Sequence, residues 1–347
     1  MLSLIWFILI LGAIVAVHEF GHFIFAKLSN TYVYEFSIGM GKKLFGKKRK
    51  GGETEFCLRA VPLGGYVMIA GEDVEDDKIP KNRQMCNKGF FSRFMILFAG
   101  AFFNFIFAFL ILFISALIFG SVSPRPYIGA VNPEYPAYEA GLESGDYVIS
   151  LDNEKILYWD RGLVMLQTNK GDSVLFKVKK IDGTIKEYSV KPILEEDDNG
   201  NKAYKFGIAM SSEKEYGFVN SLEYAWDKTI SLFISMWDTI KYLFTGRVGV
   251  NQLSGPVGIY SIVDSQAEEG FDAILYLVAY LSINVGLINL LPFPAFDGGR
   301  ILFLFIEKIF RKPVSKKVEN IIHSIGFMLI IGLLIFVTFN DILRLFR

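Results

Sequence analysis

Four long runs of apolar residues divide the chain into membrane-spanning and polar parts. A hydrocarbon core of roughly 30 Å needs about 20 residues of helix, and each run is long enough. The runs therefore predict four transmembrane helices, over Leu2–Leu28, Phe94–Phe119, Ala273–Phe296 and Ile321–Asn340. The first run lacks a basic leader and a small-residue cleavage site, so we interpret it as a retained anchor and not a secretory signal.

The connection over residues 29–93 predicts a small sheet followed by a linker. Strand-like runs such as Thr54–Arg59 lie among several glycines, a pattern typical of short strands joined by turns. Residues 72–88 are polar and predict a linker that leads to the second span. We expect the sheet to press against one face of the membrane.

Residues 122–210 predict a separate β-rich domain. Short apolar runs alternate with Gly, Asp and Asn turns, and strands are expected over 147–151, 173–179 and 186–190. Asp182-Gly183 is a hairpin signal between the last two.

The segment over residues 211–271 has a different pattern. Large apolar residues repeat at helical spacing within 221–245, which predicts an amphipathic helix at the membrane interface. A helix packed on the β-rich domain is the alternative that the same pattern allows.

Composition and charge agree with a multi-pass protein. The chain has 347 residues, 33 of them Phe, and a mean hydropathy of +0.36, which is too apolar for an ordinary soluble enzyme. Its formal net charge is zero, so we expect no nucleic-acid partner. Cys57 and Cys86 are not spaced as a CxxC pair, which favours two reduced thiols over a disulfide or a thiolate metal site.

The distribution of charge predicts an orientation. Residues 27–93 carry 13 Lys or Arg against 8 Asp or Glu, and residues 297–320 carry 6 against 3. Residues 120–272 carry 15 against 23. The positive-inside rule places the two basic connections in the cytoplasm. The N-terminus and the β-rich domain are then expected outside the membrane.

The sequence HEFGH at residues 18–22 is the clearest chemical signal. Residues four apart share one face of a helix, so His18 and His22 can bind one zinc ion while Glu19 acts on a water as general base. Three ionisable side chains this close together are costly inside a membrane helix and indicate a functional site. Histidines that are merely satisfied by neighbouring helices are the alternative.

A catalytic zinc site normally has three protein ligands, so a third must be found. Asp297 ends the third apolar run and His323 begins the fourth, and both are candidates. Glu307 or a cysteine is less favoured. The first and third spans cross the membrane in the same direction, which puts Asp297 at a depth similar to that of the HEFGH histidines.

The surroundings of Asp297 favour it as the third ligand. Two prolines before it break the helix, which membrane proteins tolerate where backbone lines a cavity. Asn284 and Asn289 add amide groups to the same span. Taken alone, Asp297 could equally be the N-cap of the helix that follows.

Four sequences together resemble a known family. HEFGH, NLLPFPAFDGG at 289–299, VPLGGY at 61–66 and SGPVG at 254–258 are similar to the site-2 protease family of intramembrane zinc metalloproteases, with the bacterial regulator of sigma-E protease branch nearest. The resemblance covers nearly the whole chain in order. It implies Zn²⁺ bound by His18, His22 and Asp297, with Glu19 as the catalytic base.

The resemblance also implies partners and a location. It assigns Asn284 and Asn289 to binding of extended substrate and the sheet to pairing with substrate as an added strand. It identifies residues 122–210 as a PDZ-like domain, on the sequences IGAV at 128–131 and AGLESGD at 140–146. Expected partners are the lipid bilayer, single-span membrane substrates such as an anti-sigma factor or remnant signal peptides, and a peptide ligand of the PDZ-like domain.

The expected fold is a polytopic α-helical membrane protein with about four transmembrane helices. It has a membrane-associated β-sheet on the cytoplasmic face and one extracytoplasmic PDZ-like domain, in a bacterial inner membrane. The four spans are expected at 1–28, 94–119, 272–298 and 321–347, the last including a C-terminal tail. Between them lie the small sheet with its linker (29–93), the PDZ-like domain (122–210), the interfacial segment (211–271) and a cytoplasmic loop or helix (299–320).

Intramembrane proteolysis has two rival interpretations. One is a membrane-anchored zinc protease whose active site lies in a cytosolic domain, but HEFGH then would lie outside the span. The other is a non-catalytic scaffold that binds partners through the PDZ-like domain, against which the intact Glu19 argues.

Overall fold

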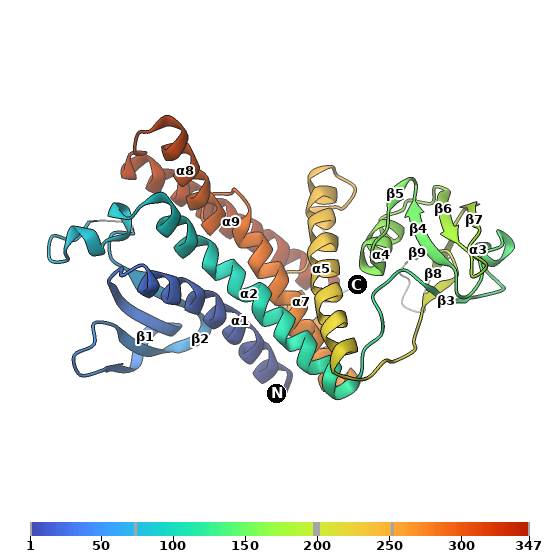
Figure 1. The fold of residues 1–347 in the computed structure, drawn as a ribbon, viewed down its shortest axis with the longest axis horizontal. Helices are drawn as coiled ribbons and strands as arrows, with labels where there is room; N and C mark the ends of the chain where they lie inside the picture. Colours follow the sequence, from blue (N-terminus) through green and yellow to red (C-terminus); the bar gives the residue numbers. More distant parts are fainter. Residues whose placement is uncertain (1, 73–74, 197–201, 251–252, 346–347) are drawn as a thin grey trace. The chain divides into compact units, whose positions relative to one another are not determined.

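The computed structural model describes residues 2–72, 75–196, 202–250 and 253–345, which form two compact units (Figure 1). The helical unit comprises Met1–Ile111 and Asn251–Arg347, and the β-rich unit comprises Leu112–Val250. Residues 346–347 of the expected C-terminal tail lie outside the described part.

Four helices are long and apolar enough to cross a membrane. They are α1 (Leu2–Leu28), α2 (Phe90–Phe119), α7 (Phe271–Leu290) and α9 (Lys316–Leu345). The mean hydropathy of their most apolar 18-residue stretches lies between 1.9 and 2.7, which confirms the four long apolar helices that the sequence predicts. Helix α2 begins four residues before the predicted start because Phe90–Arg93 continue its helical turn.

The third span is shorter than the sequence predicted. Helix α7 ends at Leu290, because Pro292 and Pro294 lack a backbone N–H and cannot continue a helix. The chain turns through residues 291–296 and starts again as α8 (Asp297–Phe310). Asp297 is therefore the first residue of α8 and not its N-cap, a position that Phe296 occupies.

Two helices lie within residues 211–271, and the sequence predicted only the first of them. Helix α5 (Phe218–Phe244) belongs to the β-rich unit, whereas α6 (Pro256–Glu269) belongs to the helical unit. Proline suits the first turn of α6 because its missing N–H would have no partner there. The backbone N–H groups of Gly255 and Gly258 donate to Oδ2 of Asp341 in α9, at 2.8 and 2.9 Å.

The core of the helical unit has two parts. Buried residues of α1, α6 and α7 form one cluster: Phe7, Ile10, Ile14, Val263, Ile274, Leu277 and Val278. A second cluster joins α1 and α2 to the small sheet: Ala26, Val33, Ile69, Met85, Ile96 and Leu97. Met85 comes from the predicted linker, which includes the 3₁₀ turns η1 (Lys81–Arg83) and η2 (Met85–Asn87) and packs against this core.

The small sheet consists of β1 (Val33–Lys48) and β2 (Glu55–Ile69), which confirms the strands expected in this connection. Residues 35–38 of β1 lie between two stretches of β2: Phe36, for example, is opposite both Val67 and Phe56. The described partners of residues 65–69 all lie in β1, so this stretch is an edge of the sheet.

The β-rich unit contains the strands predicted from the alternating pattern. β5 (Glu154–Lys155), β4 (Tyr147–Leu151), β6 (Val174–Lys179) and β7 (Ile185–Val190) form one sheet in that order. β3 (Ile128–Val131) pairs with β10 (Ile208–Met210), and β8 (Ile193–Glu196) with β9 (Lys202–Lys205). The short helix α3 (Pro136–Glu139) and helix α4 (Trp159–Gln167) complete it.

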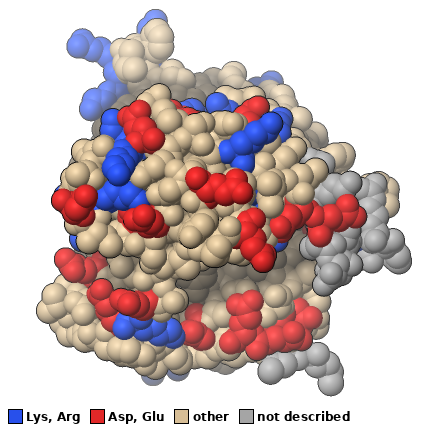
Figure 2. All heavy atoms as spheres, turned by 90° about the vertical axis from the view of Figure 1, so that its right-hand side faces the viewer, with Lys and Arg blue, Asp and Glu red and all other residues tan. Residues whose placement is uncertain are grey.

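The core of this unit is separate from that of the helical unit. Phe176 and Leu151 are fully buried and Trp159 is nearly so. Acidic and basic side chains are interspersed on the face drawn in Figure 2. Some charged side chains of this unit form ion pairs, including Lys177 with Glu187 at 2.8 Å.

Helices α1 and α2 approach closely within the HEFGH sequence. A Cβ atom on Gly21 would lie 2.3 Å from the carbonyl oxygen of Ala99, so residue 21 has no room for a side chain. Close backbone approach at a small residue is a common means of packing membrane helices.

Gly21→Ala is expected to lower the midpoint of thermal unfolding in detergent. The added methyl group must push α1 and α2 apart, and over-packing of this kind costs about 1–3 kcal/mol. Gly332→Ala in α9 is the matched control, because a Cβ there meets no atom within 4 Å. Equal midpoints for the two variants would contradict this account of the helix contact.

Candidate metal centre

The structure brings His18, His22 and Asp297 together. The Nε2 atom of His18 lies 3.2 Å from Nε2 of His22 and 3.1 Å from Oδ2 of Asp297. Nε2 of His22 lies 3.3 Å from the same Oδ2 atom. Both histidines are 7% exposed. Residues 18–22 and residue 297 therefore present three potential ligand atoms to one point.

The spacing of these atoms fits a zinc ion. Zinc bonds of about 2.0–2.1 Å in a tetrahedral site separate neighbouring ligand atoms by about 3.3–3.4 Å. Two imidazole nitrogens and one carboxylate oxygen are ordinary zinc ligands that leave one position open. Oδ2 of Asp297 is buried and accepts no hydrogen bond of good geometry from the described residues, and a cation would stabilise it.

The start of α8 places Asp297 at this point. A Cβ atom on Gly298 would lie 2.2 Å from the carbonyl oxygen of Leu291, so the first turn of α8 rests directly on the preceding loop. A carboxylate in the first turn of a helix also faces the positive end of the helix dipole. Because Gly298 has no side chain, the first turn of α8 can lie against this loop, which fixes the position of the Asp297 carboxylate.

Helix α2 supports His22 through its backbone. Nδ1 of His22 lies 2.7 Å from the carbonyl oxygen of Ile96 and donates its proton there, which leaves the lone pair on Nε2. A Cβ atom on Gly100 would lie 2.4 Å from Nε2 of His22 and 2.7 Å from Cε1 of His18. The imidazole rings therefore lie directly against the backbone of α2.

Asn104 supports the other histidine. Its side chain is fully buried in α2, and its amide lies 3.3 Å from Nδ1 of His18. With the amide nitrogen toward His18, Oδ1 of Asn104 has no partner among the described residues. The two ends of an amide are nearly equivalent in shape, and turning it lets Oδ1 accept the Nδ1 proton of His18. That bond leaves Nε2 of His18 free to bind metal.

Sequence reasoning missed α2 as a support for the centre. The signal was present in Asn104, an amide within an otherwise very apolar span. A polar side chain in such a span usually finds a partner on a neighbouring helix. Ile96 and Gly100 contact the histidines through their backbone atoms, and the residue types at these positions do not predict such contacts.

A cavity of about 490 Å³ lies beside the three ligand atoms. Glu19 is half-buried and lines it, and a Cβ atom on Gly65 would lie 3.6 Å from Cγ of Glu19. Asn289 also lines the cavity and donates to the carbonyl oxygen of Val285 at 2.9 Å. Asn284 is not among the lining residues, and its Oδ1 is buried without a hydrogen bond from the described residues.

The other candidate ligands are held elsewhere. Nδ1 of His323 accepts a hydrogen bond from the backbone N–H of Ala295 at 2.9 Å. Glu307 pairs with Arg93 at 2.6 Å. Cys57 is buried in the small sheet and is not among the residues that line the cavity.

Glu35, Glu55 and Cys57 form a second cluster of possible metal ligands, with donor atoms within 4.8 Å of one another. Glu35, however, accepts hydrogen bonds from Arg59 at 2.7 Å and Tyr66 at 2.8 Å. Burial would raise the pKa of Glu35, but these bonds outweigh it and hold the pKa below its usual value. The carboxylate charge is thus already compensated.

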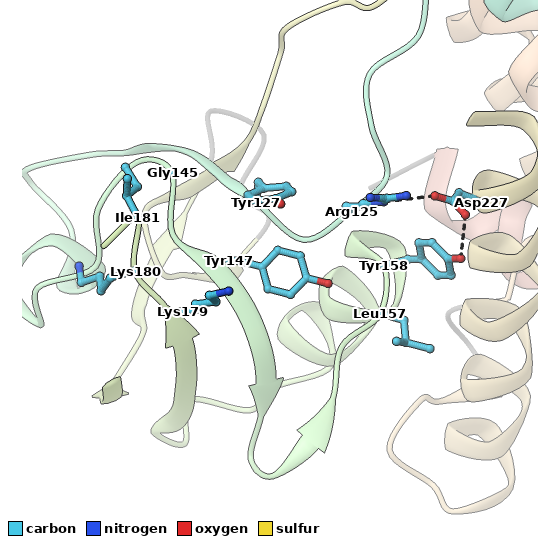
Figure 3. Close-up of a pocket in the computed structure, with 10 residues that line it drawn as sticks. All are labelled: Arg125, Tyr127, Gly145, Tyr147, Leu157, Tyr158, Lys179, Lys180, Ile181 and Asp227. Carbon is cyan, nitrogen blue, oxygen red and sulfur yellow. Dashed lines mark hydrogen bonds and ion pairs between the residues drawn. The ribbon is translucent and has the colours of Figure 1, made fainter. Parts of the chain in front are cut away.

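The β-rich unit contains a larger cavity of about 680 Å³, drawn in Figure 3. Two of its charged groups are engaged with each other: Arg125 pairs with Asp227 of α5 at 3.4 Å, and the Tyr158 hydroxyl also donates to Asp227, at 3.1 Å. Its lining residues include no His or Cys and only one carboxylate. Among the described residues, both groups that could hold a metal ion lie in the helical unit.

Comparison with known proteins agrees with this assignment. The model of peptidase family M50 matches residues 6–333. Regulator of sigma-W protease RasP from Bacillus subtilis is 32% identical over 99% of both chains. Zinc metalloprotease RasP from Oceanobacillus iheyensis is 31% identical over 100% of both chains. A Clostridium perfringens protein with a provisional zinc metalloprotease name is 36% identical over 98% of both.

One solved structure is similar to part of the chain. The PDZ domain of the SdrC-like protein from Listeria innocua is 25% identical, with 27% of this chain and 99% of that chain covered and a TM-score of 0.22.

Asn104→Leu is expected to weaken metal binding by about 10- to 100-fold, because it removes the acceptor that fixes the His18 ring. Asn104→Asp keeps a side-chain oxygen at the same place and should retain most of the affinity. Chelator competition on the purified protein measures both. Wild-type affinity in Asn104→Leu would show that the amide does not support the centre.

Proposed function

The chain belongs to peptidase family M50 and is a zinc metalloprotease, and we propose that it hydrolyses peptide bonds inside the membrane-spanning segments of its substrates. The sequence resemblance to the site-2 protease family and the expected Zn²⁺ are thereby confirmed.

One observation carries the proposal. HEFGH lies within α1, inside the candidate span Ser3–Leu28 of mean hydropathy 2.1. A zinc protease with a cytosolic active site would carry this sequence on a water-soluble helix, so its position in the span favours chemistry within the membrane.

We assign the metal to His18, His22 and Asp297. When bound, zinc supplies a Lewis acid that polarises the scissile carbonyl and acidifies a water molecule. Glu19 lines the same cavity and follows His18 in sequence, so it is placed to accept a proton from the attacking water. The same carboxyl group then returns the proton to the leaving amine. Both proton transfers use one side chain, as general acid–base catalysis allows.

A helical substrate must open before it can be cut, because its carbonyl groups are held in internal hydrogen bonds. Residues 64–67 and 69 line the cavity, and the described partners of 65–69 lie on one side only. An unwound substrate segment can pair with this edge as an added strand. Asn289 lines the cavity and can bind the freed backbone, whereas the assignment of Asn284 to substrate rests on the resemblance alone.

The β-rich unit supports a proposal of peptide recognition. A cavity of about 460 Å³ lies between α4 and β10 and is lined by apolar side chains that include Trp159, Leu163, Leu166 and Ile208. The described strand partner of β10 is β3, on one side. A peptide could therefore add to the other edge, as in PDZ domains.

The proposed setting follows from charge and exposure. We place the protein in a bacterial inner membrane, with the β-rich unit outside and the metal centre near the cytoplasmic side. Trp226, Trp237 and Phe244 of α5 are 63%, 53% and 83% exposed, which supports an interfacial position for that helix. Proposed substrates are single-span proteins, such as an anti-sigma factor or remnant signal peptides. The sigma-W regulator among the relatives supports the former.

Glu19→Gln is expected to retain zinc and to lose cleavage by at least about 100-fold, because the proton acceptor is gone while the ligands remain. Asp297→Ala is expected to lose both zinc and activity. Metal analysis and cleavage of a model single-span substrate in liposomes measure these effects. Full zinc occupancy in Asp297→Ala would reverse the ligand assignment.

The position of the cut tests the intramembrane proposal. Mass spectrometry of the products should place the cut within the apolar segment of the model substrate. Replacing a glycine by leucine near that point should slow cleavage about fivefold, because opening the helix then costs about 1 kcal/mol more. The same change far from the cut is the control. A cut outside the apolar segment would sink the proposal.

A further inference from the structure

The loop that delivers Asp297 contains a strained residue. Ala295, two positions before Asp297, has a φ of +79°, in the left-handed region that residues with a side chain rarely adopt. A residue in this conformation persists only where its surroundings hold it. Within the loop, the hydrogen bonds are short-range: Phe293 to Leu291 at 2.7 Å and Phe296 to Phe293 at 3.3 Å. They do not involve the N–H of Ala295.

The N–H of Ala295 is bound by helix α9 instead. It donates to Nδ1 of His323 at 2.9 Å. One turn further along α9, a Cβ atom on Gly326 would lie 2.4 Å from Cβ of Pro294 and 2.6 Å from its carbonyl oxygen. Residues three apart share one face of a helix, so His323 and Gly326 contact adjacent residues of the same loop.

His323 also packs against the helix that Asp297 begins. Its ring lies 5.7 Å from that of Phe303 in α8, centroid to centroid, at an angle of 49°. The side chain thus contacts α8 and the loop before it at once. Because Nδ1 accepts the bond from Ala295, the ring proton is on Nε2, and the lone pair of Nδ1 is not available to a metal.

We propose that His323 is a positioning residue for the metal centre: it holds the loop through Ala295 so that Oδ2 of Asp297 meets His18 and His22. The inference rests on the ligand assignment proposed above and extends it to a helix that carries no ligand. It also accounts for all three histidines of the chain, two as ligands and one as the support of the third ligand.

The test uses the full-length protein in detergent, loaded with zinc or with cobalt alone. His323→Leu removes the acceptor, whereas His323→Asn places an amide oxygen near the position of Nδ1. We expect His323→Leu to bind zinc about 10- to 100-fold more weakly and to change the visible absorption of bound Co²⁺. His323→Asn should restore most of the affinity and the wild-type spectrum, which a merely space-filling role would not predict.

Two further variants keep the test decisive if His323→Leu does not fold. Gly326→Ala keeps the His323 side chain but pushes α9, and His323 with it, away from the loop at Pro294, so it should also weaken zinc binding. Ala295→Gly keeps the N–H and relieves the unfavourable φ, so it should bind zinc at least as tightly as the wild type.

Three outcomes would overturn the inference. They are wild-type zinc affinity in His323→Leu, equal weakness in His323→Leu and His323→Asn, or loss of a metal-bound nitrogen in the X-ray absorption spectrum of His323→Leu. The last would make His323 a ligand. Asp297→Ala separates this inference from the proposed function: zinc retained there refutes the ligand assignment itself, whereas wild-type behaviour of His323→Leu refutes only the role of α9.

Discussion

The requirement that every buried polar group in an apolar helix bundle has a partner governs this protein. Two imidazoles and a carboxylate lie within 3.3 Å of one another beside helices built mostly of Phe, Leu and Ile. An unsatisfied polar group that is buried in such surroundings costs several kcal/mol. The outward nitrogens of the two rings are therefore bound to a carbonyl oxygen and an amide of α2, and the inward atoms are left to a metal.

Close packing of backbones makes this arrangement possible. The rings of His18 and His22 lie against α2 at Gly100, and α8 lies against its own preceding loop at Gly298. Each contact lacks room for even one methyl group. The centre is consequently held by main-chain atoms as much as by side chains, and its geometry depends on the spacing of whole helices. A rigid frame of this kind suits a site whose ligands come from distant parts of the sequence.

The sequence was sufficient to pick out the three candidate ligands and the four long apolar helices, but not the groups that support the candidate centre. HEFGH and the residues before Asp297 carry chemical signals in their residue types, and hydrophobic runs of 20 or more residues are hard to mistake. Helix α6 was missed because its 14 residues are only moderately apolar and follow a segment with a similar pattern. The prolines Pro292 and Pro294 indicated a break in the helix, but the expected span was still extended to Phe296, whereas α7 ends at Leu290. The bond from Ala295 to His323 depends on a φ angle that no residue type indicates.

The order in which the ligands occur along the chain has a consequence for biogenesis. Asp297 follows His22 by 275 residues, and His323 lies later still. At roughly 5–20 residues per second, a ribosome needs on the order of ten seconds to a minute to reach Asp297 after His22 has been made. During that interval HEFGH can already lie in the bilayer without a complete metal site. On the proposed ligand assignment, the metal site can be completed only when the last helices join the first.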